Sequence, residues 1–444
     1  QFIDSTTRYK SKWFAQKPHS NNQNTKQYEY TPSSYSLNES FSQETPFVQV
    51  AELELLKPLR YDKILIVTTE IAADKYFERI KESLYDIGYS EIKKIILSED
   101  MSTQGQWHWF EQILSEIEDD DSLSVDLTHG YRSIPIIFST AINFLQWAKN
   151  IKIDHVFYGA FDKNRETVPI IEMKEFYSIN MWANAIERLV EDADARKIAE
   201  LSNNVPEYQI SELNNPCIIN ALMDLSNRIK NTDINYVNNS SVDVINNIRK
   251  IEDATPIERL LFNAIEKKYS VLGECYDLSG KYDKNYFEMQ LELIKLYNEH
   301  KLYMQSFTSM RELIGSIGLI EIPNARYDND NGRKLRRKYS EIFIGMVQFK
   351  EEEWYYLNKS DKRYSEDDNK HANDLMKYYS KLKKYNIVEQ LRSFVKDMIR
   401  YRNRLDHGWT EWNGFDSAVI KNAEIYHSKL NEVVKLLIKY NILK

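Results

Sequence analysis

Short apolar runs alternate with segments of helical spacing over the first 177 residues, and this alternation limits the fold more than any other feature of the sequence. The run KILIVTT at 63–69 is typical of a buried strand, and the segment after it has the spacing of a helix that ends at Gly88. Strands are expected at 63–69, 93–98, 122–127 and 153–161, and helices at 45–56, 72–87, 107–117 and from 135 onward. This order predicts an α/β Rossmann-like domain with a parallel, doubly wound sheet.

The beginning of the chain is more polar. We interpret Gln1-Phe2-Ile3 as the end of a first strand and the segment DSTTRYKSKWF after it as a polar turn. Residues 17–45 are rich in Asn, Gln, Ser and Thr, and they predict a long loop or a β-excursion.

The second part of the chain has a different texture. From about residue 178 the apolar residues follow helical spacing, so 178–444 is expected to be all-α, with polar interruptions at 202–216 and 323–340. A chain of 444 residues exceeds what one core usually organises. We therefore predict two domains, 1–177 and 178–444.

Composition excludes several classes of protein. A net charge of −8 argues against a surface built to grip duplex DNA, although it leaves room for a local basic pocket. The longest apolar stretch, 134–148, is interrupted by polar residues and too short to span a bilayer. The two cysteines, Cys217 and Cys275, form no disulfide framework or thiolate zinc site, and we see no cluster of metal-ligating histidines or carboxylates. We expect a cytoplasmic protein that binds no membrane, no DNA and no metal.

One strand is followed by an unusual loop. After 122–127 the sequence continues Thr128-His129-Gly130-Tyr131-Arg132, and the next helix has a proline in its first turn. Ligands bind outside the carboxyl ends of the strands of a parallel sheet, where free N–H groups of a helix start favour phosphate. The loop therefore predicts a ligand site, and the alternative is an ordinary βα turn.

Two other predicted strand ends carry hydroxyl groups. Ser5-Thr6-Thr7-Arg8 follows the expected first strand, and Thr68-Thr69 ends the strand at 63–69. Together with the loop after residue 127 they predict a crevice lined by hydrogen-bond donors. Hydroxyl side chains at these positions are also ordinary helix caps.

A second group of polar residues lies near the end of the chain, in the segment 391–409. Leu391, Phe394, Val395, Met398, Ile399 and Leu405 form the apolar stripe of a helix. On this spacing Arg402 falls on the buried face, with Asn403 and His407 along its edge and Gly408 as a left-handed cap. A buried arginine needs an anion, such as a carboxylate or an RNA phosphate. The alternative is a common helix stop signal, with cations in the last turn followed by glycine.

With both motifs in place, the chain resembles the CRISPR-associated CARF–HEPN ribonucleases of type III systems. Asp126-Leu127-Thr128-His129-Gly130-Tyr131-Arg132 is similar to the sensor signature of one branch of this family, and Arg402-Asn403…His407 is similar to its nuclease motif. The resemblance implies a CARF domain at 1–177 that binds cyclic oligoadenylate, and a helical linker followed by an all-α HEPN ribonuclease domain within 178–444. The residues implied for the ligand are Ser5, Thr6, Thr7, Arg8, Thr68, Thr69, Thr128, His129, Gly130, Tyr131 and Arg132.

The resemblance also implies an activity. A homodimer, or a higher oligomer, would bring two Arg402–His407 pairs to one cleft, where single-stranded RNA is cut without metal in type III CRISPR antiviral defence. The 2′-hydroxyl attacks phosphorus and leaves a 2′,3′-cyclic phosphate and a 5′-hydroxyl, with Arg402, Asn403 and His407 as the catalytic residues. The allosteric activator would be cyclic tetraadenylate, with cyclic hexaadenylate as the second choice, and no cofactor is required.

Two other functions stay open: a non-catalytic sensor of cyclic oligonucleotides, and a ring nuclease that degrades cyclic oligoadenylate in the CARF pocket. A ligand-controlled transcription factor fits less well, because no recognition helix rich in base-reading residues is evident. The basic run at 333–338 could guide RNA, or it could be a solvated loop.

Overall fold

The computed structural model describes residues 11–16, 32–57, 59–100, 102–128, 134–160, 166–202, 211–273, 278–410 and 414–444, with only the backbone at 11–16 and 134–135. The chain divides into two compact units, Gln1–Met181 and Trp182–Lys444. The division falls inside helix α5 (Lys174–Asp192), and the boundary predicted at 177/178 lies within the same helix.

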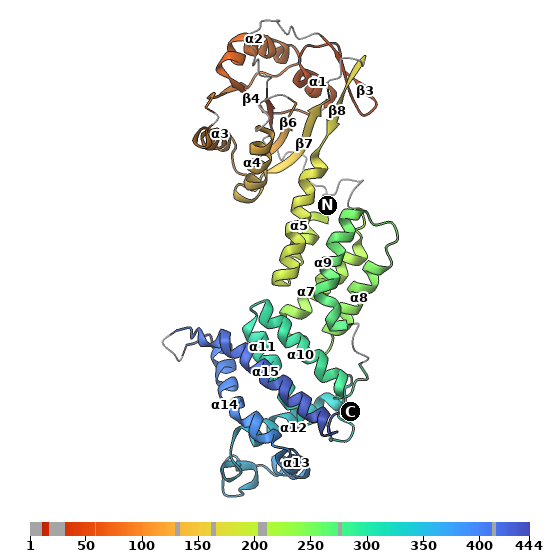
Figure 1. Ribbon diagram of the computed structural model, residues 1–444, viewed down its shortest axis with the longest axis vertical. Helices are drawn as coiled ribbons and strands as arrows, with labels where there is room; N and C mark the ends of the chain where they lie inside the picture. Colours follow the sequence, from red (N-terminus) through yellow and green to blue (C-terminus); the bar gives the residue numbers. More distant parts are fainter. Residues whose placement is uncertain are drawn as a thin grey trace, which may run out of the picture. The chain divides into compact units, whose positions relative to one another are not determined.

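The N-terminal unit contains an eight-stranded sheet in the order β3-β2-β8-β7-β6-β1-β4-β5 (Figure 1). Five of these strands, β7-β6-β1-β4-β5, are parallel, which confirms the predicted parallel core of the sheet. The strands are β1 (Ser11–Gln16), β2 (Ser34–Leu37), β3 (Ser40–Phe41), β4 (Lys63–Thr69), β5 (Ile92–Leu97), β6 (Ser122–Asp126), β7 (Lys152–Gly159) and β8 (Thr167–Glu172).

Helices cover both faces of the sheet, as a doubly wound fold requires (Figure 1). Side chains of a strand alternate between the two faces, and β4 shows this directly. Ile64 and Ile66 pack in one core with α1 and α2, whereas Leu65 and Val67 pack in the other with α3 and α4. The helices are α1 (Val48–Leu55), α2 (Glu70–Asp86), α3 (Thr103–Ser115) and α4 (Ile134–Ala148).

Two features of the sheet differ from the prediction. The first described strand is Ser11–Gln16, which begins within the segment that we interpreted as a polar turn (4–14) and lies between β4 and β6 in the sheet. Its sequence SKWFAQ has only three apolar residues, so the spacing gave a weak signal. The edge strands were also missed in part: β8 pairs antiparallel with β7, and β2 and β3 form the β-excursion expected within 17–45.

The C-terminal unit is helical in its described residues, as predicted. Besides the end of α5 it contains α6 (Arg196–Ser202), α7 (Pro216–Lys230), α8 (Val237–Arg249), α9 (Pro256–Gly273), α10 (Lys284–Glu299), α11 (Tyr303–Ile317), α12 (Asp330–Gln348), α13 (Glu366–Lys384), α14 (Ile387–Asp406), α15 (Ala418–Lys439) and the short 3-10 helices η1 (Glu351–Glu353) and η2 (Tyr355–Leu357). Helix α14 packs against α11, α12, α13 and α15 through its apolar stripe, which includes Leu391, Phe394, Val395 and Met398. This packing fixes the orientation of the remaining faces of α14.

The exposed loop predicted at 323–340 is wrong from Asp330 onward, where α12 begins. Asn329 caps this helix, because its Oδ1 accepts the N–H of Gly332 at 2.9 Å. A Cβ at Gly332 would lie 1.9 Å from the carbonyl oxygen of Arg326, so only glycine fits this tight entry. The sequence Asn-Asp-Asn-Gly, which is typical of a loop, here starts a helix.

The basic run at 333–338 is consequently helical. Arg336 is not available to a ligand, because its guanidinium donates to Glu312 Oε2 at 2.9 Å and to Ser316 Oγ at 2.9 Å, beside two tyrosine hydroxyls. Arg333 and Lys338 pair with Asp330 and Asp367. Arg336 therefore holds α12 against α11, and the run is not a continuous solvated track of cations.

Among the helices of the described residues, none combines the length and the apolar character needed to cross a bilayer.

Candidate functional site

The carboxyl ends of the parallel strands lie along one edge of the sheet, where a doubly wound fold binds ligands. β4 ends there at Thr69 and β6 at Asp126. Among the five parallel strands of the core, β4, the next after β1 in the sequence, lies on one side of β1, whereas β7, the next after β6, lies on the other side of β6. The strand order therefore reverses between β1 and β6, and the chain that follows Asp126 leaves the sheet at this switch point.

The two threonines that end β4 are buried. Thr69 is the N-cap of α2, and its Oγ1 accepts the N–H of Ala72 at 3.4 Å. The Oγ1 of Thr68 donates to the carbonyl of Thr69 at 3.2 Å. In this structure both hydroxyls serve the strand end and the start of the helix, which is the capping role that the sequence left as an alternative.

Thr128 connects β6 to β7. Its N–H donates to Asp126 Oδ1 at 2.8 Å, its hydroxyl donates to the same oxygen, and its Oγ1 accepts the N–H of Gly159 at 2.7 Å. The second oxygen of Asp126 accepts from Gln49 Nε2 of α1 at 2.8 Å. Asp126 and Thr128 thus fix the position from which the chain enters the switch point.

A second carboxyl group lies next to this network. Glu52 of α1 is fully buried, and neither of its side-chain oxygens has a hydrogen-bond partner among the described residues. Burial raises the pKa of Glu52 well above its usual range, and the nearby Asp126 raises it further. Burial also raises the pKa of Asp126 to about 6, against the opposing effect of its hydrogen bonds with Thr128 and Gln49. Protons are therefore held more tightly here than on exposed carboxyls.

Most of the residues predicted for the ligand lie outside the described part of the chain: Ser5, Thr6, Thr7, Arg8, His129, Gly130, Tyr131 and Arg132. His129 to Arg132 follow β6 at the switch point in chain order. Ser5 to Arg8 were predicted to follow the first strand, but in the sequence they precede β1, the first described strand.

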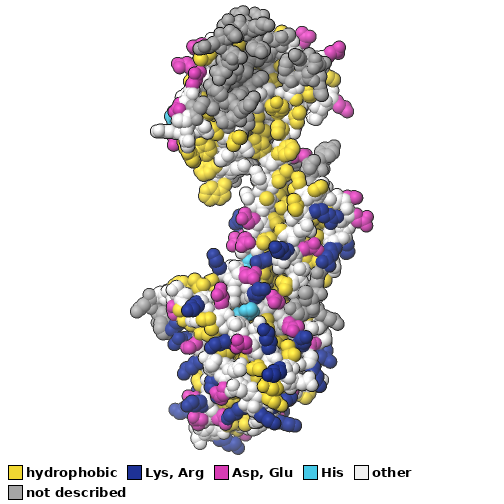
Figure 2. Space-filling model, viewed as in Figure 1, with side chains coloured by type: hydrophobic (Ala, Val, Ile, Leu, Met, Phe, Trp, Pro, Cys, Tyr) yellow, Lys and Arg dark blue, Asp and Glu magenta, His cyan; other side chains and the backbone are white. Residues whose placement is uncertain are grey.

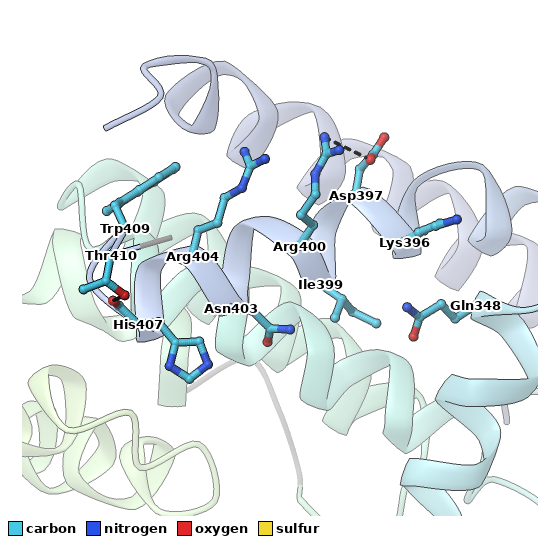
Figure 3. A pocket seen from close by; sticks show the side chains of 10 residues that line it. All are labelled: Gln348, Lys396, Asp397, Ile399, Arg400, Asn403, Arg404, His407, Trp409 and Thr410. Carbon is cyan, nitrogen blue, oxygen red and sulfur yellow. Dashed lines mark hydrogen bonds and ion pairs between the residues drawn. The ribbon is translucent and has the colours of Figure 1, made fainter. Parts of the chain in front are cut away.

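In the C-terminal unit, a groove of about 360 Å³ lies along the exposed face of α14 (Figure 3). Asn403 and His407 line it, as do Lys396 and Arg400 of the same helix. Successive residues of a helix are about 100° apart, so these four side chains fall within about 60° of one another around the axis. Gln348, the last residue of α12, lines the groove beside Lys396, and Thr410 lines it just beyond the end of α14.

Arg402 is not among the residues that line this groove. His407 follows Arg402 by five positions, so the two side chains point about 140° apart around the helix axis. Its Nη1 lies 3.3 Å from Oδ1 of Asn403 and 3.2 Å from Oδ2 of Asp406. The structure therefore brings Asn403 and His407 together, and it links Arg402 to them only through the amide of Asn403.

The prediction that Arg402 falls on the buried face of the helix is wrong. Its side chain is 29% exposed, whereas that of Arg404 is 7% exposed. The buried stripe continues from Met398 to Tyr401, so Arg402 lies at its edge. Arg404 is buried instead beneath the segment after the helix, with Nη1 3.7 Å from Asp416 Oδ2 and its guanidinium over the ring of Trp409.

The end of α14 follows the prediction. Gly408 has φ of +60° and forms the left-handed cap, and Trp409 has the same sign of φ. The N–H of Trp409 donates to the carbonyl of Arg404 at 2.9 Å. The chain reverses immediately after His407, which leaves the imidazole exposed at the mouth of the groove.

Sequence reasoning missed three residues of interest: Lys396, Arg400 and Glu52. The first two could have been found, because Lys396, Arg400, Asn403 and His407 follow the helical spacing of four, three and four residues. Glu52 gave no signal, since a single glutamate within VAELELL is typical of the exposed side of a helix.

No model of a protein family matches the chain. Over 250 residues it is 23% identical to CRISPR-associated protein MJ1674 of Methanocaldococcus jannaschii, which covers 55% of this chain and 36% of that protein. The chain is thus similar to a CRISPR-associated protein. The match spans little more than a third of the relative's length.

A solved structure of Csm6 from Enterococcus italicus bound to cyclic hexa-2'-fluoro-hexa-dAMP aligns with 98% of this chain and 96% of its own, at 9% identity and a TM-score of 0.43. A likeness of this degree supports no conclusion about the chain.

Within the described part of the chain, no three histidine, cysteine, aspartate or glutamate side chains are grouped so as to hold a metal ion.

Proposed function

We propose that the chain is a type III CRISPR effector: an endoribonuclease of the HEPN type that cleaves single-stranded RNA and is activated by cyclic oligoadenylate. The observation that carries the proposal is the groove on α14, where an amide and an imidazole, Asn403 and His407, lie beside cationic side chains. The similarity to a CRISPR-associated protein supports the biological setting.

The chemistry follows from the groups at the end of α14. Imidazole is the side-chain group that exchanges protons most readily near neutral pH, and His407 serves as general acid or base. Attack of the ribose 2′-hydroxyl on the adjacent phosphorus breaks the bond to the 5′-oxygen, which takes up a proton. The products carry a 2′,3′-cyclic phosphate and a 5′-hydroxyl. The proton lost by the 2′-hydroxyl balances the one taken up by the 5′-oxygen, so the step needs no oxidant and no metal.

Arg402 stabilises the charge that develops on the non-bridging oxygens, which is usually the largest contribution to such catalysis. In one chain its guanidinium is about 140° around the helix from His407 and is paired with Asp406. We infer that a second copy of the chain completes the site, so that Arg402 of one copy and His407 of the other reach the same phosphate. Asn403 orients the arginine through its Oδ1.

The N-terminal unit is the sensor in this proposal. Cyclic oligoadenylate binds at the switch point between β1 and β6, where His129, Gly130, Tyr131 and Arg132 follow Asp126 in the chain. The hydroxyl of Thr128 is engaged with Asp126 and Gly159, so we assign it a positioning role. Cyclic tetraadenylate is the expected activator, and cyclic hexaadenylate is the second choice.

The test is an RNA cleavage assay with the full chain. Labelled single-stranded RNA is incubated with the protein and a chelator, with no ring, cyclic tetraadenylate or cyclic hexaadenylate, and the product ends and the ring are analysed by chromatography. Ring-stimulated cleavage with cyclic phosphate ends is expected. Ring binding without RNA cleavage would support the non-catalytic sensor, and ring degradation alone would support the ring nuclease.

A further inference from the structure

Lys396 and Arg400 have no role in the proposed reaction, yet they line the same groove as Asn403 and His407 (Figure 3). Both side chains are exposed on the face of α14 that is opposite to its apolar stripe. Lys396 has no ion-pair or hydrogen-bond partner among the described residues, and Arg400 pairs with Asp397 at 3.2 Å across an exposed contact. Exposed pairs of this kind are weak, so both cations are available to an anion.

The charge of the groove differs from that of its surroundings. Its lining contains two exposed cations, Lys396 and Arg400, the buried Arg404 that pairs with Asp416, and one carboxylate, Asp397, although the chain carries a net charge of −8. On the face of the C-terminal unit seen in Figure 2, by contrast, Lys and Arg side chains are interspersed with Asp and Glu. The groove is thus a local site for a polyanion.

The cations also form a line that leads away from His407. With a rise of about 1.5 Å per residue, Arg400 lies about 10 Å and Lys396 about 16 Å along the helix axis from His407. Arg400 therefore leaves α14 about two turns from His407, which places it beside a phosphate next to the one on which His407 acts.

We propose that Lys396 and Arg400 bind the backbone phosphates of single-stranded RNA that flank the cleaved one, on one side only. This inference rests on the proposed function and adds to it a direction for the strand along α14. Phosphate contacts fix register without reading sequence. The enzyme therefore gains affinity from nucleotides on the Lys396 side of the cleaved bond and little from those on the other side.

The first test measures binding and needs no cleavage. Fluorescence anisotropy with a labelled 2′-O-methyl RNA strand is recorded at several salt concentrations, with and without cyclic tetraadenylate. The double variant Lys396→Gln/Arg400→Gln is compared with Lys267→Gln/Lys435→Gln, which removes two exposed cations elsewhere in the same unit. Loss of two phosphate contacts lowers the slope of log affinity against log salt by about 1.4, which weakens binding about tenfold at 0.15 M salt.

The second test separates this inference from the proposed function. Strands with one ribonucleotide among deoxynucleotides have a single cleavable bond, and they are lengthened on one side or the other. For wild type, cleavage improves as nucleotides are added on one side, and in the double variant this gain disappears.

An equal salt slope for the double variant and its control overturns the inference, even if RNA cleavage is observed. Conversely, if the wild-type chain cuts no RNA but the double variant alone loses salt-dependent binding, the proposed function fails and the phosphate site stands.

Discussion

Arg402 Nη1 lies 3.3 Å from Oδ1 of Asn403, and this contact joins two faces of α14 that the helix geometry keeps apart. On one face Arg402 pairs with Asp406, and on the other His407 borders the groove. Asn403 lines the groove and also contacts Arg402, so it links the two faces of the helix. An arginine and a histidine five positions apart thus lie on different faces of one helix, which is why the proposed site needs a second chain to bring them to the same phosphate.

The two neighbouring arginines of α14 are expected to fail in different ways. Arg402→Met should lower RNA cleavage about 100-fold or more, because it removes the charge that stabilises the transition state, with unfolding free energy within about 0.5 kcal/mol of wild type. Arg404→Met should lower the unfolding free energy by about 1–3 kcal/mol, because Arg404 is buried against Asp416 and Trp409. Cleavage rates and urea denaturation of both variants check this. The assignment of roles is wrong if the two phenotypes are exchanged.

Asp406 competes with RNA for Arg402 in the proposed site. Asp406→Asn removes the ion pair at 3.2 Å, and since exposed pairs contribute up to about 1 kcal/mol, the expected rise in kcat/KM is about two- to fivefold. Asp243→Asn, which removes another exposed carboxylate of the same unit, is the control. A fall in kcat/KM for Asp406→Asn alone would mean that the carboxylate assists Arg402 instead.

The buried Glu52 predicts a particular pH dependence. Its pKa is raised in the folded chain, so the folded state favours the protonated form. Protonated Glu52 therefore makes its full contribution to the free energy of unfolding below the pKa of glutamate in the unfolded chain, about 4.3. This contribution is lost as the pH rises towards the higher pKa of Glu52 in the folded chain. Glu52→Gln should therefore gain unfolding free energy relative to wild type as pH rises from 5 to 8. Hydrogen exchange of peptides from α1 and β4 measures this.

The matched variant Glu78→Gln, on the exposed face of α2, should show no such trend. Parallel pH profiles for wild type and Glu52→Gln would mean that Glu52 finds a partner for its charge in the folded protein.

Thr128 is expected to act on ligand binding through position. Thr128→Val keeps the shape of the side chain but removes the hydrogen bonds to Asp126 and Gly159. We expect an unfolding free energy about 1–3 kcal/mol lower and a weaker affinity for cyclic tetraadenylate by calorimetry. Thr140→Val, at an exposed position of α4, is the control. Unchanged ring affinity in a destabilised Thr128→Val would place the ligand away from β6.

The sequence predicted the parts of the fold where a single periodicity dominates. β4 follows from the β-branched run KILIVTT, because a strand buried on both faces is apolar almost throughout, and β5, β6 and β7 follow from shorter apolar runs. β1 did not, since SKWFAQ carries three apolar residues and is placed by its neighbours in the sheet. The start of α12 was missed because Asn329 and Gly332 have turn chemistry as well as capping chemistry.

The candidate site was predictable in position but not in detail. Spacing placed Asn403 and His407 on one side of a helix, and the structure agrees. Spacing alone could not distinguish Arg402 from Arg404, because burial at the end of α14 depends on the segment that folds back over it through Asp416 and Trp409. At the sheet edge, the threonines were recognised, but only the structure shows that Thr68, Thr69 and Thr128 bond within the protein.

His407 is proposed to carry out proton transfer in RNA cleavage, and its replacement can be compared with that of another exposed histidine. Wild type and His407→Ala are incubated with single-stranded RNA, cyclic oligoadenylate and a chelator, with His108→Ala, an exposed histidine of α3, as the matched control. We expect wild type and His108→Ala to cut RNA to 2′,3′-cyclic phosphate ends, and His407→Ala to bind the ring but to cleave more slowly by a factor of at least about 100. Cleavage by His407→Ala at the wild-type rate would contradict this role for His407.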